Sequence, residues 1–289
     1  MKNFDYLEPR TVTEACALLK QHGGEAKVFA GGVHLTILMK QGLLEPKSLI
    51  NIKKIPELKG IRFDDGEGLT IGALVTHREL ETSALVKDKF PVLCEAEREV
   101  ANIRVRNMGT VGGNLASGEP LTDLSQIFIA LDGTAKIAGP SGQRTIPVEE
   151  LFLDFYTTCL AEDEILTQVM LPPLPLRSGI EYIRFSSSSV VDKPCAGVAV
   201  RLTLRNGGET IETAHIVLGC VGATPVRARK AEALLMGKKL TAELAEQAGS
   251  TASQECSPAS DLRGSEQYKR AIVRTLVKRA AAKAWERAK

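Results

Sequence analysis

Residues 109–124 read GTVGGNLASGEPLTDL, a stretch that passes through the pair Gly112 and Gly113 and ends on Asp123 before an apolar run. Glycine tolerates positive φ and lets a ligand lie directly against the main chain. Successive amide groups in such a turn can form a concave site for an anion. Residues 29–35, FAGGVHL, have the same design. We interpret the two turns as the two sides of one diphosphate-binding site.

The first turn lies between a predicted strand over 26–30 and a predicted helix over 35–41. A helix start presents free N–H groups and a partial positive charge, which suits phosphate. The turn contains no lysine or arginine, so its main chain would do the binding. His34 could hydrogen-bond the diphosphate or cap the helix. Taken alone, the turn is also explained by a tight strand-to-helix connection that binds no ligand.

In the second turn, the side-chain amide of Asn114 can donate a hydrogen bond to a phosphate. Asp123 could accept hydrogen bonds from ribose or ribityl hydroxyls, or cap the helix predicted over 124–131. Neither turn matches GxGxxG in a βαβ unit with an acid about 20 residues later, so a Rossmann dinucleotide site is not indicated. The second turn lacks the GK[ST] sequence of a P-loop.

The composition is that of an ordinary globular protein, with 289 residues, 44% hydrophobic and 25% charged. A net charge of +2 and an aromatic content of 4% argue against nucleic-acid binding. No CxxC pair occurs among the six cysteines, so zinc and iron–sulfur ligation are not expected. The N-terminus lacks the apolar core of a signal peptide, and no apolar run is long enough for a membrane span. We therefore expect a cytoplasmic protein.

The predicted elements define an α+β fold in two domains, 1–175 and 176–289. Three prolines at 172, 173 and 175 mark the boundary, because proline fits neither a helix interior nor a central strand. Before the boundary we predict mixed strands and helices, including one helix over 90–102. Beyond it we predict a small antiparallel sheet followed by helices. Residues 195–204 alternate apolar and polar side chains, which predicts a half-buried strand.

The paired motifs AGGVHL at 30–35 and TVGGNL at 110–115 resemble those of the FAD-binding medium subunits of molybdenum hydroxylases. This is the xanthine dehydrogenase and carbon monoxide dehydrogenase family, and the resemblance covers the whole chain. It implies a two-lobed FAD domain of the vanillyl-alcohol-oxidase (PCMH) type, with lobes over about 1–55 and 56–175. The cofactor-binding residues that it implies are Ala30, Gly31, Gly32, Val33, His34, Leu35, Thr110, Val111, Gly112, Gly113, Asn114, Asp123, Ile165, Leu166 and Lys193.

The resemblance implies that the diphosphate would lie on the two turns and that Asp123 would hold hydroxyls of FAD. The strand at Ile165 and Leu166 would supply main-chain contacts near the adenine side. The second domain would cover the isoalloxazine, with Asp192 and Lys193 as candidates for contacts at the flavin edge. Gly113→Val is then expected to abolish FAD retention while leaving the second domain folded.

The resemblance also implies an electron-transfer subunit without a catalytic acid, base or metal ligand of its own. Electrons would pass through FAD between the [2Fe-2S] clusters of a small partner and an external acceptor, for which NAD is a candidate. A large partner would carry the molybdenum cofactor and hydroxylate the substrate. Two alternatives remain open from the sequence: a stand-alone FAD-dependent oxidase or reductase, and a non-redox nucleotide-binding scaffold.

The sequence departs from the family pattern at three places. Val33 and His34 replace the usual Thr-Asp or related pair, and Glu119 stands where the family often has serine. Because a carboxylate near a diphosphate is repelled, we expect Glu119 to point to solvent. The loop over 186–193 lacks the arginine-rich pattern common in the family.

Overall fold

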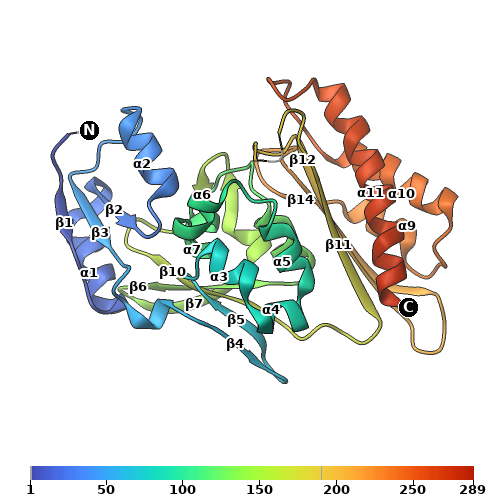
Figure 1. Cartoon of the computed structure of the whole chain (residues 1–289), viewed down its shortest axis with the longest axis horizontal. Helices are drawn as coiled ribbons and strands as arrows, with labels where there is room; N and C mark the ends of the chain where they lie inside the picture. The colour runs from blue at the N-terminus through green and yellow to red at the C-terminus, as the bar shows by residue number, and fades with distance from the viewer. Residues whose placement is uncertain (1, 190) are drawn as a thin grey trace.

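The computed structural model describes residues 2–189 and 191–289 and has three parts in a row, seen from left to right in Figure 1. The first part is a lobe built on a parallel sheet with strand order β1-β3-β2. The lobe also contains two helices. The bounds are β1 Asp5–Leu7, α1 Val12–His22, β2 Ala26–Phe29, α2 Val33–Lys40 and β3 Ser48–Asn51.

Helix α1 begins where Thr11 accepts a hydrogen bond from the Glu14 amide, as expected of a capping threonine. The apolar face of α1 buries Ala15, Cys16 and Leu19 against the small sheet. Helix α2 begins at Val33, two residues earlier than predicted, directly after Gly32 at φ +74°. The first glycine turn is therefore the start of α2 itself.

The central part is a second lobe around an antiparallel sheet with strand order β4-β5-β10-β6-β7. Its strands are β4 Ile61–Asp64, β5 Gly68–Gly72, β6 Thr134–Gly139, β7 Gly142–Pro147 and β10 Ile165–Leu171. Short helices cover the sheet: α3 His77–Thr82, α4 Ala84–Lys89, α5 Pro91–Glu97, α6 Ile103–Met108, α7 Val111–Ala116 and α8 Leu124–Ala130. The remaining pieces are the 3₁₀ turns at 23–25, 56–58 and 148–151 and the hairpin of β8 Phe152–Asp154 and β9 Thr157–Thr158.

The single helix predicted over 90–102 is wrong. Helix α5 ends at Glu97, and Ala101 adopts φ +44°, which no continuing α-helix allows. The side chain of Asn102 then accepts hydrogen bonds from the amides of Arg104 and Val105 and so starts α6. The second glycine turn thus follows a helix, whereas the sequence pattern predicts an extended segment before it.

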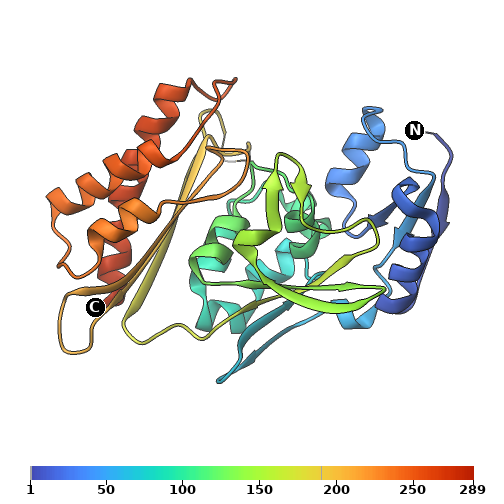
Figure 2. The ribbon, with the colours of Figure 1, turned by 180° about the vertical axis from the view of Figure 1, so that it is seen from behind.

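The third part is an antiparallel sheet with strand order β11-β12-β13-β14, followed by three helices. Its elements are β11 Ser178–Phe185, β12 Ala196–Leu204, β13 Ile211–Gly219, β14 Val226–Arg227, α9 Arg229–Leu235, α10 Ala242–Glu255 and α11 Glu266–Ala288. Helices α9 to α11 lie on the outer side of this sheet in both views (Figure 2). Gly179 on β11 allows α11 to come close, because a Cβ there would lie 2.0 Å from the Ala284 carbonyl oxygen.

The α+β class is confirmed, but β12 is buried along its whole length and not half-buried. Helix α11 covers one of its faces, and α8 of the central part packs against the other. The alternating Arg201 and Thr203 therefore lie between the parts and not in solvent. The predicted boundary after residue 175 lies between β10 and β11, and it stays a prediction.

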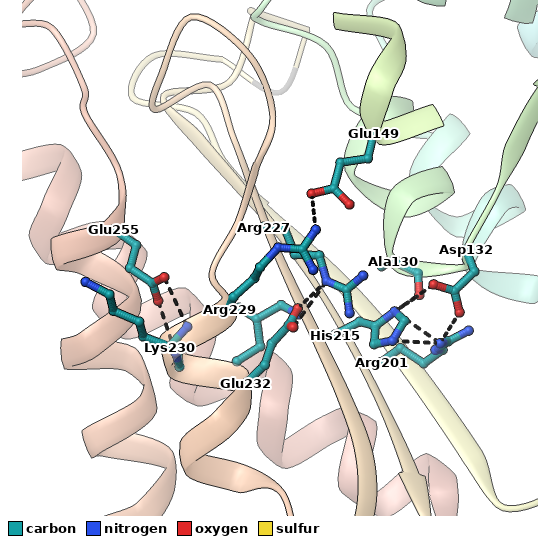
Figure 3. A network of polar contacts seen from close by, with 12 residues as sticks. Ala130, Asp132, Glu149, Arg201, His215, Arg227, Arg229, Lys230, Glu232 and Glu255 are labelled. Atoms are coloured by element: carbon teal, nitrogen blue, oxygen red, sulfur yellow. Dashed lines mark hydrogen bonds and ion pairs between the residues drawn. The ribbon is translucent and has the colours of Figure 1, made fainter. Parts of the chain in front are cut away.

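A polar network joins the end of α8 to the third part (Figure 3). Asp132 pairs with Arg201 at 2.5 Å and with Nδ1 of His215 at 3.3 Å. His215 also hydrogen-bonds the carbonyl oxygen of Ala130 at 3.2 Å. Along the same seam, which is the interface between the central and third parts, Arg229 pairs with Glu149 at 2.7 Å. The central and third parts are thus held together by charged groups as well as by apolar packing.

We expect His215 to make stability pH-dependent. Burial and the Arg201 charge lower its pKa from 6.5 to about 4. Protonation therefore favours the unfolded chain, so stability is fully present above about pH 6.5 and is lost as pH falls towards 4. The loss is at most about 3 kcal/mol. Urea unfolding at several pH values should show a flatter profile for His215→Gln. His22→Gln, at the end of α1, should keep the wild-type profile, and an equal flattening there would contradict the assignment.

Candidate functional site

The two glycine turns touch each other. A Cβ at Gly31 would lie 2.1 Å from the Met108 carbonyl oxygen and 2.9 Å from the Gly109 Cα. Real Cβ atoms essentially never approach that closely, so residue 31 has room for hydrogen only. The first lobe and the central part therefore meet at the two stretches that the sequence singles out.

The first turn presents unused main-chain donors. Gly32 occupies the N-cap position of α2 without a side-chain hydrogen bond. Within the described residues, the amides of Val33, His34 and Leu35 have no hydrogen-bond acceptor. Three free N–H groups at a helix start are a site for an anion. His34 caps no helix, so that alternative for its side chain is wrong.

The second turn uses most of its amides within the fold. The amides of Val111 and Gly112 donate to the carbonyl oxygens of Val75 and Ala73. The Gly113 amide donates to the hydroxyl of Thr110, which caps α7. This turn is consequently fixed against the central sheet. A ligand could pack against its main chain, but most of its amides are already hydrogen-bonded within the fold.

Two features of the second turn fit a bound group. A Cβ at Gly113 would meet no atom within 4 Å except the Thr110 hydroxyl oxygen, at 2.9 Å, so the space beside this residue is open. The side-chain oxygen of Asn114 is buried and has no hydrogen-bond partner in the described residues. A buried polar atom without a partner is costly in free energy unless a ligand or water supplies one.

Asp123 is buried at the end of the second stretch and connects it to the third part. Its Oδ1 accepts a hydrogen bond from the Tyr182 hydroxyl at 2.7 Å and lies 3.4 Å from Nε of Arg184. Burial raises the pKa of Asp123, and the Arg184 charge offsets part of this effect. Asp123 stands at the N-cap position of α8, but its side chain makes no capping hydrogen bond. The alternative of side-chain capping is therefore wrong.

The expectation that Glu119 points to solvent is also wrong. Its side chain is 5% exposed and pairs with Lys193 at 2.5 Å. The Tyr156 hydroxyl donates to the same carboxylate at 3.2 Å, and the Leu121 amide donates at 3.2 Å. These donors replace the water that the carboxylate would otherwise need. Lys193 therefore reaches the central part from the third, and its place at the flavin edge stays a prediction.

Other predicted residues lie around this centre. Ile165 and Leu166 on β10 are buried and pair with Ala138 and Ile137 of β6, so only their main chain could face a ligand. Ala30, Val33 and Leu35 are half-buried around the first turn. Asp192 is exposed, and its carbonyl oxygen accepts a hydrogen bond from Arg184.

Sequence reasoning missed Tyr156, Tyr182 and Arg184. Tyr156 stacks on His34 with ring centroids 5.9 Å apart, and it adopts φ +53°. Tyr182 and Arg184 occupy alternate positions of β11, and both reach Asp123. Their two-residue spacing on one strand face is the signal that could have paired them, but the identity of the partner depends on tertiary structure.

A buried ion pair lies next to the residues that lead into the second turn. Nδ1 of His77 lies 3.0 Å from Glu97, and the His77 amide donates to the Gly109 carbonyl oxygen. Burial by itself lowers the pKa of His77, but the Glu97 charge and hydrogen bond outweigh burial and raise it. The pair thus fixes Gly109, which Gly31 contacts.

A cavity lies elsewhere in the described residues. It has a volume of about 620 Å³ between α1 and the central sheet, and its lining includes Cys16, Arg62 and Lys136 but none of the predicted site residues. Among the residues that the structure describes, no group of three His, Cys, Asp or Glu side chains could hold a metal ion. None of the helices described is long and apolar enough to cross a membrane. The glycine turns therefore remain the candidate site.

The two-lobed α+β fold, with free main-chain amides and glycine turns at the junction of its lobes, is that of a protein that binds an anionic cofactor. Two family models match: the FAD binding domain in molybdopterin dehydrogenase over residues 2–174, and the CO dehydrogenase flavoprotein C-terminal domain over 182–284. The chain belongs to this family, that of the FAD-binding medium subunits of molybdenum hydroxylases. Its cofactor is FAD, and it is a subunit of an oxidoreductase.

Relatives match over nearly the whole chain. The carbon monoxide dehydrogenase medium chain of Hydrogenophaga pseudoflava is 38% identical over 284 residues, 98% of each chain. The 6-hydroxypseudooxynicotine dehydrogenase complex subunit alpha of Paenarthrobacter nicotinovorans is 33% identical, over 99% of this chain and 96% of its own. A solved structure of the Hydrogenophaga pseudoflava carbon monoxide dehydrogenase superposes with a TM-score of 0.95 at 39% identity, covering 99% of this chain and 98% of the other.

Proposed function

We propose that the chain carries electrons through FAD between the [2Fe-2S] clusters of a small partner subunit and an external acceptor, for which NAD is the candidate. A large partner would hold the molybdenum cofactor. The support is the family, together with relatives that are named medium chains or complex subunits of dehydrogenases. The same names favour this function over a stand-alone oxidase or reductase and over a non-redox scaffold.

The observation that carries the proposal is the contact of Gly31 with Met108 and Gly109. It supports a diphosphate that spans both turns, with the free amides of α2 as donors on one side and the side-chain NH2 group of Asn114 as a donor on the other. The buried Asn114 carbonyl oxygen can only accept, so it would face a hydroxyl or N–H group of the ligand. We assign to FAD the residues implied by the motifs at 30–35 and 110–114, together with Asp123, the main chain of Ile165 and Leu166, and Lys193. The FAD domain is then 1–175, and 176–289 covers it.

FAD, when bound, supplies the exchange of one or two electrons. The chain's own residues bind and orient this group, and the third part restricts the access of water to it. No side chain needs to act as an acid or base in this proposal. The substrate of the assembly would contact another chain.

The test is purification of the chain from its native host under mild conditions. A flavin absorbance spectrum with a stoichiometric FAD content, together with two further subunits that contain molybdenum and iron, is the expected result. Rapid substrate-dependent bleaching of the flavin in the isolated chain would instead support a stand-alone enzyme. A colourless chain that takes up no FAD within its assembly would contradict the proposal.

A further inference from the structure

Four side chains from three parts of the molecule meet beside the first glycine turn. Glu119 follows α7 in the central part, Tyr156 lies in the turn between β8 and β9, Lys193 comes from the loop before β12, and His34 lies in α2. Lys193 Nζ and the Tyr156 hydroxyl both contact Oε2 of Glu119, at 2.5 and 3.2 Å. Tyr156 in turn stacks on His34. We call these four residues the seam cluster.

The geometry of the cluster is fixed by the surrounding main chain. The Tyr156 amide donates to the Gly118 carbonyl oxygen at 2.9 Å, and a Cβ at Gly118 would lie 2.7 Å from the Thr157 amide nitrogen. Tyr156 itself holds φ +53°, which is uncommon for a bulky residue. On the other side, Arg184 binds the carbonyl oxygen of Asp192, the residue before Lys193. Both side-chain donors to Glu119 are therefore positioned from outside the cluster.

The charges in the cluster are unequally exposed. The Glu119 side chain is 5% exposed, whereas that of Lys193 is 48% exposed. A carboxylate that is removed from water depends on its partner, and loss of the partner leaves an uncompensated buried charge. Burial lowers the pKa of His34, and the charges of Glu119 and Lys193 act on it in opposite directions. Tyr156 hydrogen-bonds Glu119 and stacks on His34, so its side chain links the ion pair to the first turn of α2.

We propose that Glu119 and Lys193 form an electrostatic latch between the third and central parts, which controls how long FAD is retained on the first turn. The inference rests on the proposed placement of the diphosphate. A buried carboxylate beside a doubly charged diphosphate repels it, and the Lys193 ammonium cancels this repulsion. Lys193 has three N–H donors, and a half-exposed ammonium keeps donors for a second anion. Lys193 thus neutralises Glu119 and faces the cofactor, so it couples closure of the third part to retention of FAD.

The latch predicts opposite effects for its two members. Lys193→Gln leaves Glu119 uncompensated, so FAD should leave about tenfold faster. Glu119→Gln leaves Lys193 free to attract the diphosphate, so FAD should leave about threefold more slowly. The double variant restores neutrality and should release FAD within about twofold of the wild-type rate. A purely structural role would make both single variants release FAD faster.

The experiment follows release of FAD from the assembly that contains the full chain, through the rise in flavin fluorescence after dilution. Repeating it at increasing salt adds a second readout. Salt screens charges, so it should slow release from Lys193→Gln and speed release from Glu119→Gln. Arg229→Gln is the matched control, since it breaks the ion pair with Glu149 on the same seam, away from the glycine turns. It should release FAD at the wild-type rate.

Opposite signs in the single variants, with recovery in the double variant, support the latch. Equal signs, no change in either variant, or an Arg229→Gln effect equal to that of Lys193→Gln would overturn it. The wild-type FAD content separates the two proposals. An assembly that holds FAD but fails the charge test removes only the latch, whereas an assembly that never holds FAD removes the proposed function as well.

Discussion

Gly31→Ala is expected to remove FAD and to destabilise the junction of the two lobes. The added methyl group would lie 2.1 Å from the Met108 carbonyl oxygen, and main chain cannot give way as a flexible side chain can. Overpacking of this kind costs about 1–3 kcal/mol. The turns must also move apart, so a diphosphate that spans them loses one side of its site. We expect less than about a tenth of the wild-type FAD per chain, even with excess FAD.

Gly66→Ala is the control for a glycine replacement in this part of the chain. Gly66 lies in the turn between β4 and β5, and a Cβ there would be 3.4 Å from Asp64, an ordinary contact. That variant should keep wild-type FAD content and unfold at the wild-type urea concentration. Full FAD content in Gly31→Ala would show that the contact between the turns is irrelevant to binding. Equal loss in both variants would point to general instability.

The glycine turns could be predicted because their signals are local. A strand, a glycine pair and an apolar helix follow one another within about ten residues at 26–35, and the structure has β2, Gly31, Gly32 and α2 in that order. The start of α6 also had a local signal, since Asn102 is a favoured capping residue. The apolar residues before it favour one longer helix over 90–102, and the break at Ala101 has no comparable local signal.

The features that could not be predicted from the sequence depend on contacts between residues that are far apart in the chain. Glu119 is buried because Lys193, 74 positions later in the chain, supplies its counter-charge. Likewise, β12 is buried on both faces because α8 of the central part covers the face that its alternating pattern had assigned to solvent. Composition and periodicity describe each segment alone, so they cannot identify a partner that another domain contributes.

The role of Asp123 shows the same limit and leads to the second large prediction. Asp123→Ala is expected to lower the stability of the chain by about 3–5 kcal/mol even without FAD. The reason is that Arg184, whose side chain is 4% exposed, would remain buried without its counter-charge. Tyr182→Phe removes only the hydrogen bond of 2.7 Å and should cost about 1 kcal/mol. Urea unfolding can be followed through the single tryptophan, Trp285, in the core of the third part.

Asp123→Asn separates charge from hydrogen bonding, because an amide oxygen still accepts from Tyr182 but carries no charge for Arg184. Its loss of stability should therefore lie between those of Tyr182→Phe and Asp123→Ala. If Asp123 served only FAD hydroxyls, all three variants would unfold like the wild type in the absence of FAD, and only the affinity for FAD would fall. Such a result would contradict a structural role for Asp123. A loss of stability together with weaker FAD binding would mean that one carboxylate both joins the domains and contacts the cofactor.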